Sequence, residues 1–244
     1  MLIYGHRGAR GEAPENTLAG FGYAYQAGVR AFELDVRLCA DDELVVMHDA
    51  TVDRTTGATG AVAALTAAEL GRLDARRTCP TWPEPVGVPT LAAVLQRFAA
   101  LAQWAIEIKH DTPERLEQVG RRLVSAIERY DLAGRTTVTS FDPVALGIVR
   151  RLAPALPRAY IGAFDQPHEL QTALELGCRQ IDVPIATGSA ALVRAAQEQG
   201  LLVTGWQGND AAALRLLVAW GVDQITTDYP SMALAWFREQ EASA

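Results

Sequence analysis

The chain has 244 residues, of which 49% are hydrophobic and 21% charged, a balance typical of a globular protein with a sizeable core. Its net charge of −7 argues against nucleic acid as a partner, because phosphate backbones recruit basic surfaces. No apolar run approaches the ~20 residues that a spanning helix needs, so we expect no stable membrane insertion.

The three cysteines, Cys39, Cys79 and Cys178, are odd in number, lie far apart and form no CxxC motif. This pattern indicates neither a disulfide framework nor a zinc site, and it favours reduced thiols in the cytoplasm. The chain runs from Met1 straight into its first motif without a basic segment or a long apolar stretch, so we expect no signal peptide. We therefore predict a cytoplasmic protein.

Short apolar runs alternate with amphipathic stretches almost to the end of the chain. The apolar runs predict strands at 2–5, 31–36, 104–109, 136–140, 159–161, 180–183, 202–206 and 224–227. The stretches between them predict helices at 16–27, 91–101, 113–130, 142–152, 167–176, 189–199, 210–220 and 231–240. Start signals stand at Asp142-Pro143 and at Asp165 ahead of Pro167, and stop signals at Gly177, Gly200 and Gly221. This alternation favours an α/β fold of the (β/α)8 TIM-barrel type, and no Gly-rich dinucleotide motif supports a doubly wound sheet.

The segment at about 49–89 breaks the alternation. It carries a Thr- and Gly-rich stretch at 51–60, a short helical stretch near 66–73 and a Pro-rich stretch at 79–89. Because it is too long for a plain loop, we expect a small insertion after the second barrel strand, within one domain that spans residues 1–244. Such an insertion would lie at the rim where barrel enzymes keep their sites, and it could cover the pocket.

Two carboxylates share one face of the second predicted strand. Because side chains alternate along a strand, Glu33 and Asp35 point to one side and Leu34 and Val36 to the other. The apolar side of a barrel strand meets the helices, so both acids would point inward. They would repel each other unless a cation lay between them, and oxygen ligands favour Mg²⁺ or Ca²⁺. The alternative is a pair of solvated acids, which the apolar flanks disfavour.

The next stretch predicts a hairpin that turns at Asp41-Asp42. With these two as the loop residues, His48 lies opposite Asp35, and a shift of one residue in register would spoil the match. A lone histidine is more often structural than catalytic, but this one would arrive beside a candidate metal site.

His6 and Arg7 directly follow the first predicted strand and belong at the same rim. Gly5 and Gly8 permit tight backbone geometry around them, and the planar fork of arginine suits phosphate oxygens. Taken alone, this short motif is a weak signal.

The strand predicted at 104–109 adds Glu107 and Lys109, which share a face between isoleucines. We expect Glu107 to be a third carboxylate ligand and Lys109 a second phosphate cation, with a structural ion pair as the competing interpretation. Glu15 and Asn16 either support the site or begin a helix.

Two residues at the ends of late strands also attract notice. Trp206 forms either one wall of a pocket or part of the core. We expect Asp228 to cap the final helix rather than to take part in chemistry.

Eight motifs follow one another along the chain: His6-Arg7-Gly8, Pro14-Glu15-Asn16-Thr17, Glu33-Leu34-Asp35-Val36, Val45-Val46-Met47-His48-Asp49, Ile106-Glu107-Ile108-Lys109, Ser140-Phe141, Gly221-Val222-Asp223 and Thr227-Asp228-Tyr229-Pro230. Together they resemble the glycerophosphodiester phosphodiesterase family. The resemblance implies a barrel with a small insertion after His48-Asp49. It also implies hydrolysis of a small-molecule glycerophosphodiester to sn-glycerol 3-phosphate and an alcohol, with a divalent metal ion, Mg²⁺ or Ca²⁺.

By motif position, the resemblance assigns roles to single residues. It implies that the metal ligands are Glu33, Asp35 and Glu107, the acid–base pair His6 and His48, and the phosphate contacts Arg7 and Lys109. We place Trp206 at the substrate, with Glu15 and Asn16 in support of the site. The family usually has Trp-Thr-Val-Asn late in the barrel, whereas this chain has Trp206-Gln207-Gly208-Asn209, a departure that bears on the preferred head group.

The expected mechanism pairs charge stabilisation with proton transfer. The metal and the two cations draw charge off the phosphoryl oxygens. We assign His6 to deprotonate the attacking oxygen, from the neighbouring glycerol hydroxyl or a water, and His48 to protonate the departing alcohol. The sequence leaves the choice of metal, the head group and the oligomeric state open.

Two alternatives stand beside this prediction. A related phosphodiesterase acting on lysophospholipids or phosphoinositides would call for an apolar rim, which the segment around Trp82 supplies only modestly. A non-catalytic phosphate-binding barrel predicts the loss of a histidine or a carboxylate, and none is missing.

Overall fold

The computed structural model describes residues 1–166 and 168–243. The strands are β1 (Leu2–His6), β2 (Ala31–Leu38), β3 (Leu44–Val46), β4 (Gln103–Ile108), β5 (Thr136–Ser140), β6 (Arg158–Ile161), β7 (Gln180–Pro184), β8 (Leu202–Trp206) and β9 (Gln224–Thr227). The α-helices are α1 (Leu18–Gln26), α2 (Asp53–Thr56), α3 (Ala67–Leu70), α4 (Leu91–Arg97), α5 (Pro113–Arg129), α6 (Pro143–Leu152), α7 (His168–Glu175), α8 (Ala190–Glu198), α9 (Ala211–Trp220) and α10 (Pro230–Ser243). Short 3₁₀ helices are η1 (Val62–Ala64) and η2 (Ala133–Arg135).

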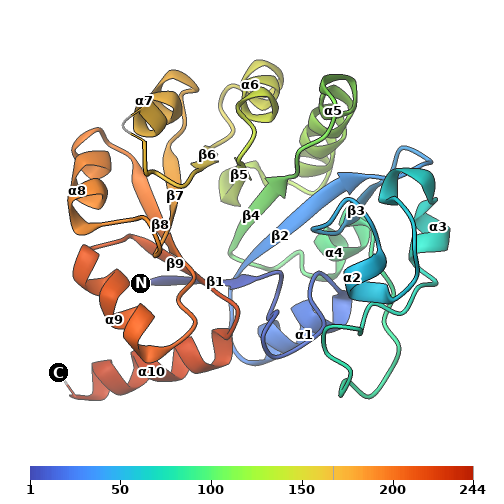
Figure 1. Cartoon of the computed structure of the whole chain (residues 1–244), viewed down its shortest axis with the longest axis horizontal. Coiled ribbons are helices and arrows are strands. Elements are labelled where there is room, and N and C mark those ends of the chain that lie inside the picture. The colour runs from blue at the N-terminus through green and yellow to red at the C-terminus, as the bar shows by residue number, and fades with distance from the viewer. Residues whose placement is uncertain (167, 244) are drawn as a thin grey trace.

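All the strands of the described chain except β3, which pairs antiparallel with β2, pair in parallel with one another and close into a barrel. Their order is β1-β2-β4-β5-β6-β7-β8-β9, and β9 pairs with β1 to complete the ring. Helices lie outside the strands (Figure 1). The predicted α/β fold of the TIM-barrel type is therefore confirmed. Within the described part of the chain, no helix combines the length and the apolar character needed to cross a membrane.

Alternation along the strands separates the core from the barrel interior. Leu34 and Val36 of β2, with Ile106 and Ile108 of β4, are at most 1% exposed and belong to one apolar cluster under the helices. The same cluster contains the buried stripe of α5, whose members recur every three or four residues: Leu116, Val119, Leu123 and Ile127. The opposite strand faces are left to line the barrel interior.

Helix boundaries follow the expected signals. Asp142 caps α6, its carboxylate accepting from a backbone amide two residues further on. Gly177, Gly200 and Gly221 follow α7, α8 and α9 with φ of 64°, 79° and 80°, a left-handed conformation that suits glycine. The start signal expected at Pro167 lies outside the described residues.

The segment between β3 and α4 carries α2, η1 and α3. Its buried side chains join those of the hairpin before it in an apolar cluster: Cys39, Val45, Met47, Val52, Val62, Leu70, Ala75 and Val88. Figure 1 shows α2 and α3 together at one side of the barrel, near β3. This packing fixes the segment against the strands that lead to His48.

The β2–β3 hairpin differs from the prediction by one residue in register. Val36 pairs with Val46, and the loop holds three residues rather than two. The Cys39 amide donates to the Glu43 carbonyl at 3.0 Å, and Asp42 adopts φ 60°, as three-residue hairpin loops require. The two-residue turn at Asp41-Asp42 was therefore wrong.

The shift in register changes how His48 reaches the site. Met47, not His48, lies opposite Asp35 and donates its amide to the Asp35 carbonyl at 3.0 Å. Strand β3 ends at Val46, so His48 enters the pocket on the chain that leaves the sheet.

Candidate active site

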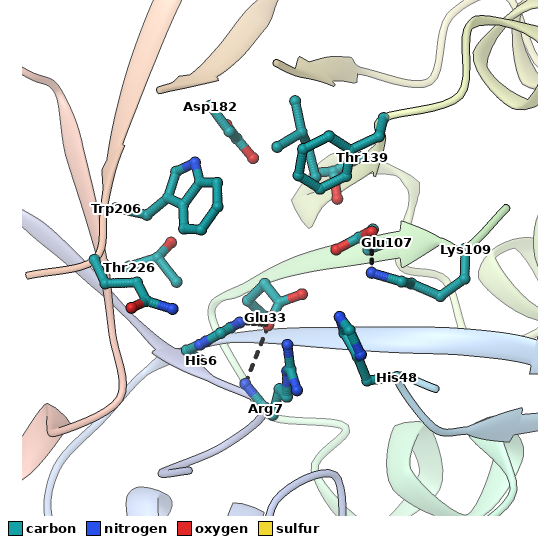
Figure 2. A pocket seen from close by; sticks show the side chains of 13 residues that line it. His6, Arg7, Glu33, His48, Glu107, Lys109, Thr139, Asp182, Trp206 and Thr226 are labelled. Atoms are coloured by element: carbon teal, nitrogen blue, oxygen red, sulfur yellow. Dashed lines mark hydrogen bonds and ion pairs between the residues drawn. The ribbon is translucent and has the colours of Figure 1, made fainter. Parts of the chain in front are cut away.

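A pocket opens at the carboxyl ends of the barrel strands (Figure 2). The residues on β1, β2 and β4, and those just after β1, β3 and β4, are mostly charged or titratable: His6, Arg7, Glu33, His48, Glu107 and Lys109. The residues from β5 to β9 are mostly aromatic, apolar or neutral: Thr139, Phe141, Ile161, Asp182, Trp206, Gln207 and Thr226. The pocket thus has a strongly charged half and a half in which Asp182 is the one ionisable group among these described residues.

Three carboxylates converge at the base of the charged half. Glu33, Asp35 and Glu107 offer oxygens that all lie within 4.8 Å of one another. Strand register explains the convergence, because Asp35 of β2 pairs with Glu107 of β4 and Glu33 lies on the same inward face of β2.

The electrostatics of this cluster are those of a cation site. Burial, followed by the charges of Asp35 and Glu107, raises the pKa of Glu33 well above its ordinary value. Burial and Asp35 raise the pKa of Glu107 to about 7. Burial also opposes the charge on Asp35, but Arg7 and Lys109 outweigh it and hold the pKa of Asp35 far below the usual range.

A divalent cation fits this cluster. The Asp35 Oδ1 atom is buried and has no hydrogen-bond partner among the described residues. All three side chains supply hard oxygen donors of the kind that Mg²⁺ and Ca²⁺ prefer. An ion bound here would relieve the mutual repulsion that raises two of the three pKa values.

Arg7 and Lys109 hold positive charge against these acids. The Arg7 backbone amide donates to Glu33 at 3.1 Å, and its Nε lies 3.2 Å from Asp35 Oδ2. Lys109 Nζ donates to Glu107 Oε1 at 2.5 Å. Arg7 has φ 52°, a strained conformation for a non-glycine residue, and the tight turn around it needs Gly5, where a Cβ would lie 2.0 Å from the Gly8 carbonyl.

His6 is held from behind by Asp228. Its Nδ1 lies 2.5 Å from Asp228 Oδ1, and its Nε2 lies 3.8 Å from Glu33. Burial opposes the charge on Asp228, but the hydrogen bond from His6 keeps its pKa low. An ionised carboxylate only accepts, so the Nδ1 atom carries the proton and Nε2 is directed to the pocket.

The expected role of Asp228 as a helix cap was wrong. Its carboxylate accepts from His6 and from Asn209 Nδ2 instead. Barrel closure accounts for this contact: Gly5 pairs with Thr227, so the residues that follow them, His6 and Asp228, meet across the β1–β9 seam.

His48 is held in a similar way by its neighbour. Its Nδ1 lies 2.6 Å from Asp49 Oδ1, and Asp49 Oδ2 accepts from Arg54 Nε at 2.6 Å. Burial opposes the charge on Asp49, but the hydrogen bonds from Arg54 and His48 lower its pKa to about 2. Burial is also the main cause that lowers the pKa of both His48 and His6.

A chain of alternating charges joins the two histidine-bearing segments. Glu15 accepts from Arg7 at 2.8 Å and from both terminal nitrogens of Arg54 at 2.7 and 2.8 Å. Asn16 donates to Asp35 Oδ2 at 2.8 Å, and the helix cap of α1 is supplied by Thr17. Glu15 and Asn16 therefore contact site residues and leave helix capping to their neighbour.

The second half of the pocket is walled by aromatic rings. Phe141 and Trp206 meet edge to face, with ring centroids 6.4 Å apart and planes at 85°. Trp206, for which a place in the core was the other possibility, lines the pocket, and its indole Nε1 has no hydrogen-bond partner among the described residues.

Residues predicted from the sequence meet in one place. The pocket brings together His6, Arg7, Glu33, His48, Glu107, Lys109 and Trp206. Asp35 completes the carboxylate cluster, and Glu15 and Asn16 contact Arg7 and Asp35.

A model of the glycerophosphoryl diester phosphodiesterase family matches residues 6–232 of this chain. The chain belongs to this family. A Bacillus subtilis glycerophosphodiester phosphodiesterase is 31% identical over 250 residues, which cover 95% of this chain and 85% of that protein.

Two solved structures extend the comparison to the fold. An Oleispira antarctica phosphodiesterase in complex with the product sn-glycerol 3-phosphate has a TM-score of 0.89 at 25% identity, covering 98% of this chain and 97% of its own. A glycerophosphodiester phosphodiesterase from Parabacteroides distasonis has a TM-score of 0.80 at 29% identity, covering 98% of each chain. Both agree with the barrel described above.

Several residues of this family member were not foreseen as parts of the site. Arg54 and Asp228 hold the two histidine assemblies, and Asp182 lies in the far half of the pocket. A signal for Asp182 was present, since it alternates with the core residues Ile181 and Val183 as Asp35 alternates with its apolar neighbours.

Proposed function

We propose that this chain hydrolyses glycerophosphodiesters to sn-glycerol 3-phosphate and an alcohol, with a divalent metal ion and two histidines. One observation carries the proposal: His6 and His48, each held at Nδ1 by a carboxylate, line one pocket with Glu33 and Glu107. The family membership and the product complex of the Oleispira relative support the same reaction.

Glu33, Asp35 and Glu107 would hold the metal ion, and Mg²⁺ and Ca²⁺ both suit their oxygens. When bound, such an ion withdraws charge from a phosphoryl oxygen and so stabilises the transition state. Arg7 and Lys109, which line the same half of the pocket, would bind the remaining phosphoryl oxygens.

The two histidines would divide the proton transfers. With Nδ1 protonated toward Asp228, neutral His6 presents a free electron pair at Nε2 and can accept the proton of the attacking oxygen. His48, held at Nδ1 by Asp49, would act in its doubly protonated form: it would deliver the Nε2 proton to the departing alcohol and be left neutral. The attacking oxygen is the neighbouring glycerol hydroxyl or a water. Their carboxylate partners keep both rings in the required orientation.

The domain organisation and the cellular compartment belong to the same proposal. We take residues 1–244 as one barrel domain, with the segment 49–89 as an insertion whose Arg54 completes the support of His48. The three free cysteines support a reducing compartment, and hence the cytoplasm.

Assays of purified protein on glycerophosphocholine, with added Mg²⁺ or Ca²⁺ and with a chelator, test the proposal. We expect metal-dependent release of glycerol 3-phosphate, and His48→Ala should lower the rate by about 10²–10⁴-fold. Activity that survives the chelator or the substitution would contradict the mechanism. Turnover of lysophosphatidylcholine in place of glycerophosphocholine would favour the lipid alternative, and binding of glycerol 3-phosphate without any turnover would favour the non-catalytic one.

A further inference from the structure

Asp182 is a buried carboxylate that the proposed chemistry does not use. It is 9% exposed, lines the pocket and points into it in the upper part of Figure 2. Its carboxylate accepts from Gln180 Nε2 at 2.7 Å, and no described residue forms an ion pair with it. A buried acid without a cation is costly unless a ligand supplies one.

Barrel topology places this acid on the opposite side of the barrel from the carboxylate cluster of Glu33, Asp35 and Glu107. From β2, which bears Glu33 and Asp35, strand β7 is the fourth strand in either direction around the ring. Asp182 of β7 therefore faces the cluster across the barrel, and a phosphodiester bound at the cluster would extend its other end toward β7.

Aromatic rings accompany Asp182 in this half of the pocket. Phe141 and Trp206 line the same pocket as Asp182 and meet edge to face, and Lys109 Nζ lies 5.9 Å from the centroid of the Phe141 ring, which therefore already faces one cation. A pocket that combines a carboxylate with aromatic rings attracts quaternary and primary ammonium groups, through charge and through cation–π contact. A neutral polyol would gain less here, because it brings no charge to offset the buried acid.

We propose that Asp182, with Phe141 and Trp206, forms a subsite for the ammonium group of the leaving alcohol, as in choline or ethanolamine diesters of glycerol 3-phosphate. The proposal rests on the proposed function and adds the residues that select the head group. Asp182 acts here as a specificity-determining residue. The bond that breaks is still the phosphoester bond to the leaving alcohol.

The test compares diesters that share glycerol 3-phosphate and differ in head group. We measure kcat/KM on glycerophosphocholine and on glycerophosphoglycerol, with metal present, for the unaltered enzyme and Asp182→Asn. The value of kcat/KM on glycerophosphocholine divided by that on glycerophosphoglycerol should be about tenfold or more lower in Asp182→Asn than in the unaltered enzyme. This is the size expected for loss of one desolvated cation contact. Asp131→Asn, which removes the same charge at an exposed residue with φ 54° that asparagine tolerates, should leave the ratio unchanged.

The outcomes separate the two proposals. If the unaltered enzyme hydrolyses both diesters and the ratio does not move in Asp182→Asn, the ammonium subsite is refuted while the proposed function stands. If neither diester is hydrolysed, the proposed function itself has failed.

A measurement on the unaltered enzyme covers the case in which Asp182→Asn does not fold. Choline should inhibit glycerophosphoglycerol hydrolysis at concentrations about tenfold or more below those of 3,3-dimethylbutan-1-ol, which has the same shape without the charge. Equal inhibition by the two alcohols would overturn the proposal.

Discussion

The buried charge of Asp182 predicts a stability cost that changes with pH. Burial raises the pKa of Asp182 from 3.8 to about 6, although Gln180 donates a hydrogen bond to its carboxylate. The folded state therefore favours the protonated acid. As pH rises from the pKa of Asp182 in the unfolded chain toward its pKa in the folded protein, the free energy of unfolding falls. Above pH 6 the full penalty applies, and well below pH 3.8 it vanishes.

The size of the penalty follows from the shift. Two pKa units correspond to about 3 kcal/mol, so the penalty is about 3 kcal/mol at pH 8 and about 1.5 kcal/mol at pH 5. Asp182→Asn removes the charge and keeps the shape, and its amide oxygen can still accept from Gln180. The variant should thus be more stable than the unaltered protein, by a margin that grows with pH.

Urea unfolding of both proteins at pH 5 and pH 8, with a chelator present, measures this margin. Other titrating groups are the same in the two proteins and cancel in the difference. A margin that stays constant between pH 5 and pH 8, or a variant that is less stable at pH 8, would refute the assignment of an unpaired buried charge to Asp182.

Three further substitutions test the supports of the site. Asp228→Asn leaves one uncharged acceptor oxygen for the two donors, His6 Nδ1 and Asn209 Nδ2, so kcat on glycerophosphocholine should fall by about 10²–10⁴-fold, and a value within threefold of the unaltered enzyme would contradict that role. Arg54→Gln releases Asp49, so kcat should fall by about tenfold or more with KM little changed, and a rise in KM alone would point to substrate binding instead. Glu107→Gln removes one of the three carboxylates that we propose as metal ligands, so titration calorimetry should show affinity for Mg²⁺ or Ca²⁺ weakened by about tenfold or more, with unchanged affinity as the contrary result.

Much of the fold was predictable because the sequence of each barrel strand is by itself typical of a strand. The strands at 136–140, 202–206 and 224–227 have the predicted bounds, since each is a short run rich in branched or apolar residues between helix signals. The inward direction of Glu33 and Asp35 follows from alternation alone and needs no knowledge of distant residues. Features set by local geometry were therefore within reach of the sequence.

The hairpin shows why a local signal can still mislead. Asp41 and Asp42 suit a loop of two residues or of three, and the structure adopts the longer one with Asp42 at φ 60°. Nothing in these residues alone distinguishes the two turns. His48 nevertheless reaches the pocket, because the chain beyond β3 is fixed by the apolar cluster of the following segment and by Arg37 of β2, whose Nε donates to the His48 carbonyl at 2.9 Å.

Asp228 was misassigned for a different reason, because its partner is set by closure of the ring. An aspartate between a strand and a helix caps helices in many proteins, and its own neighbours favour that interpretation. Only the β1–β9 pairing, in which Gly5 lies opposite Thr227, brings it beside His6. In a predicted eight-stranded barrel the first and last strands must be neighbours, so aligning their carboxyl ends would have paired His6 with Asp228 before any coordinates. The same alignment applied to β7 places Asp182 at the pocket, opposite the carboxylate cluster of β2 and β4. Burial raises the pKa of Asp182 there and no described cation pairs with it, so under the proposed subsite the substrate supplies the missing cation.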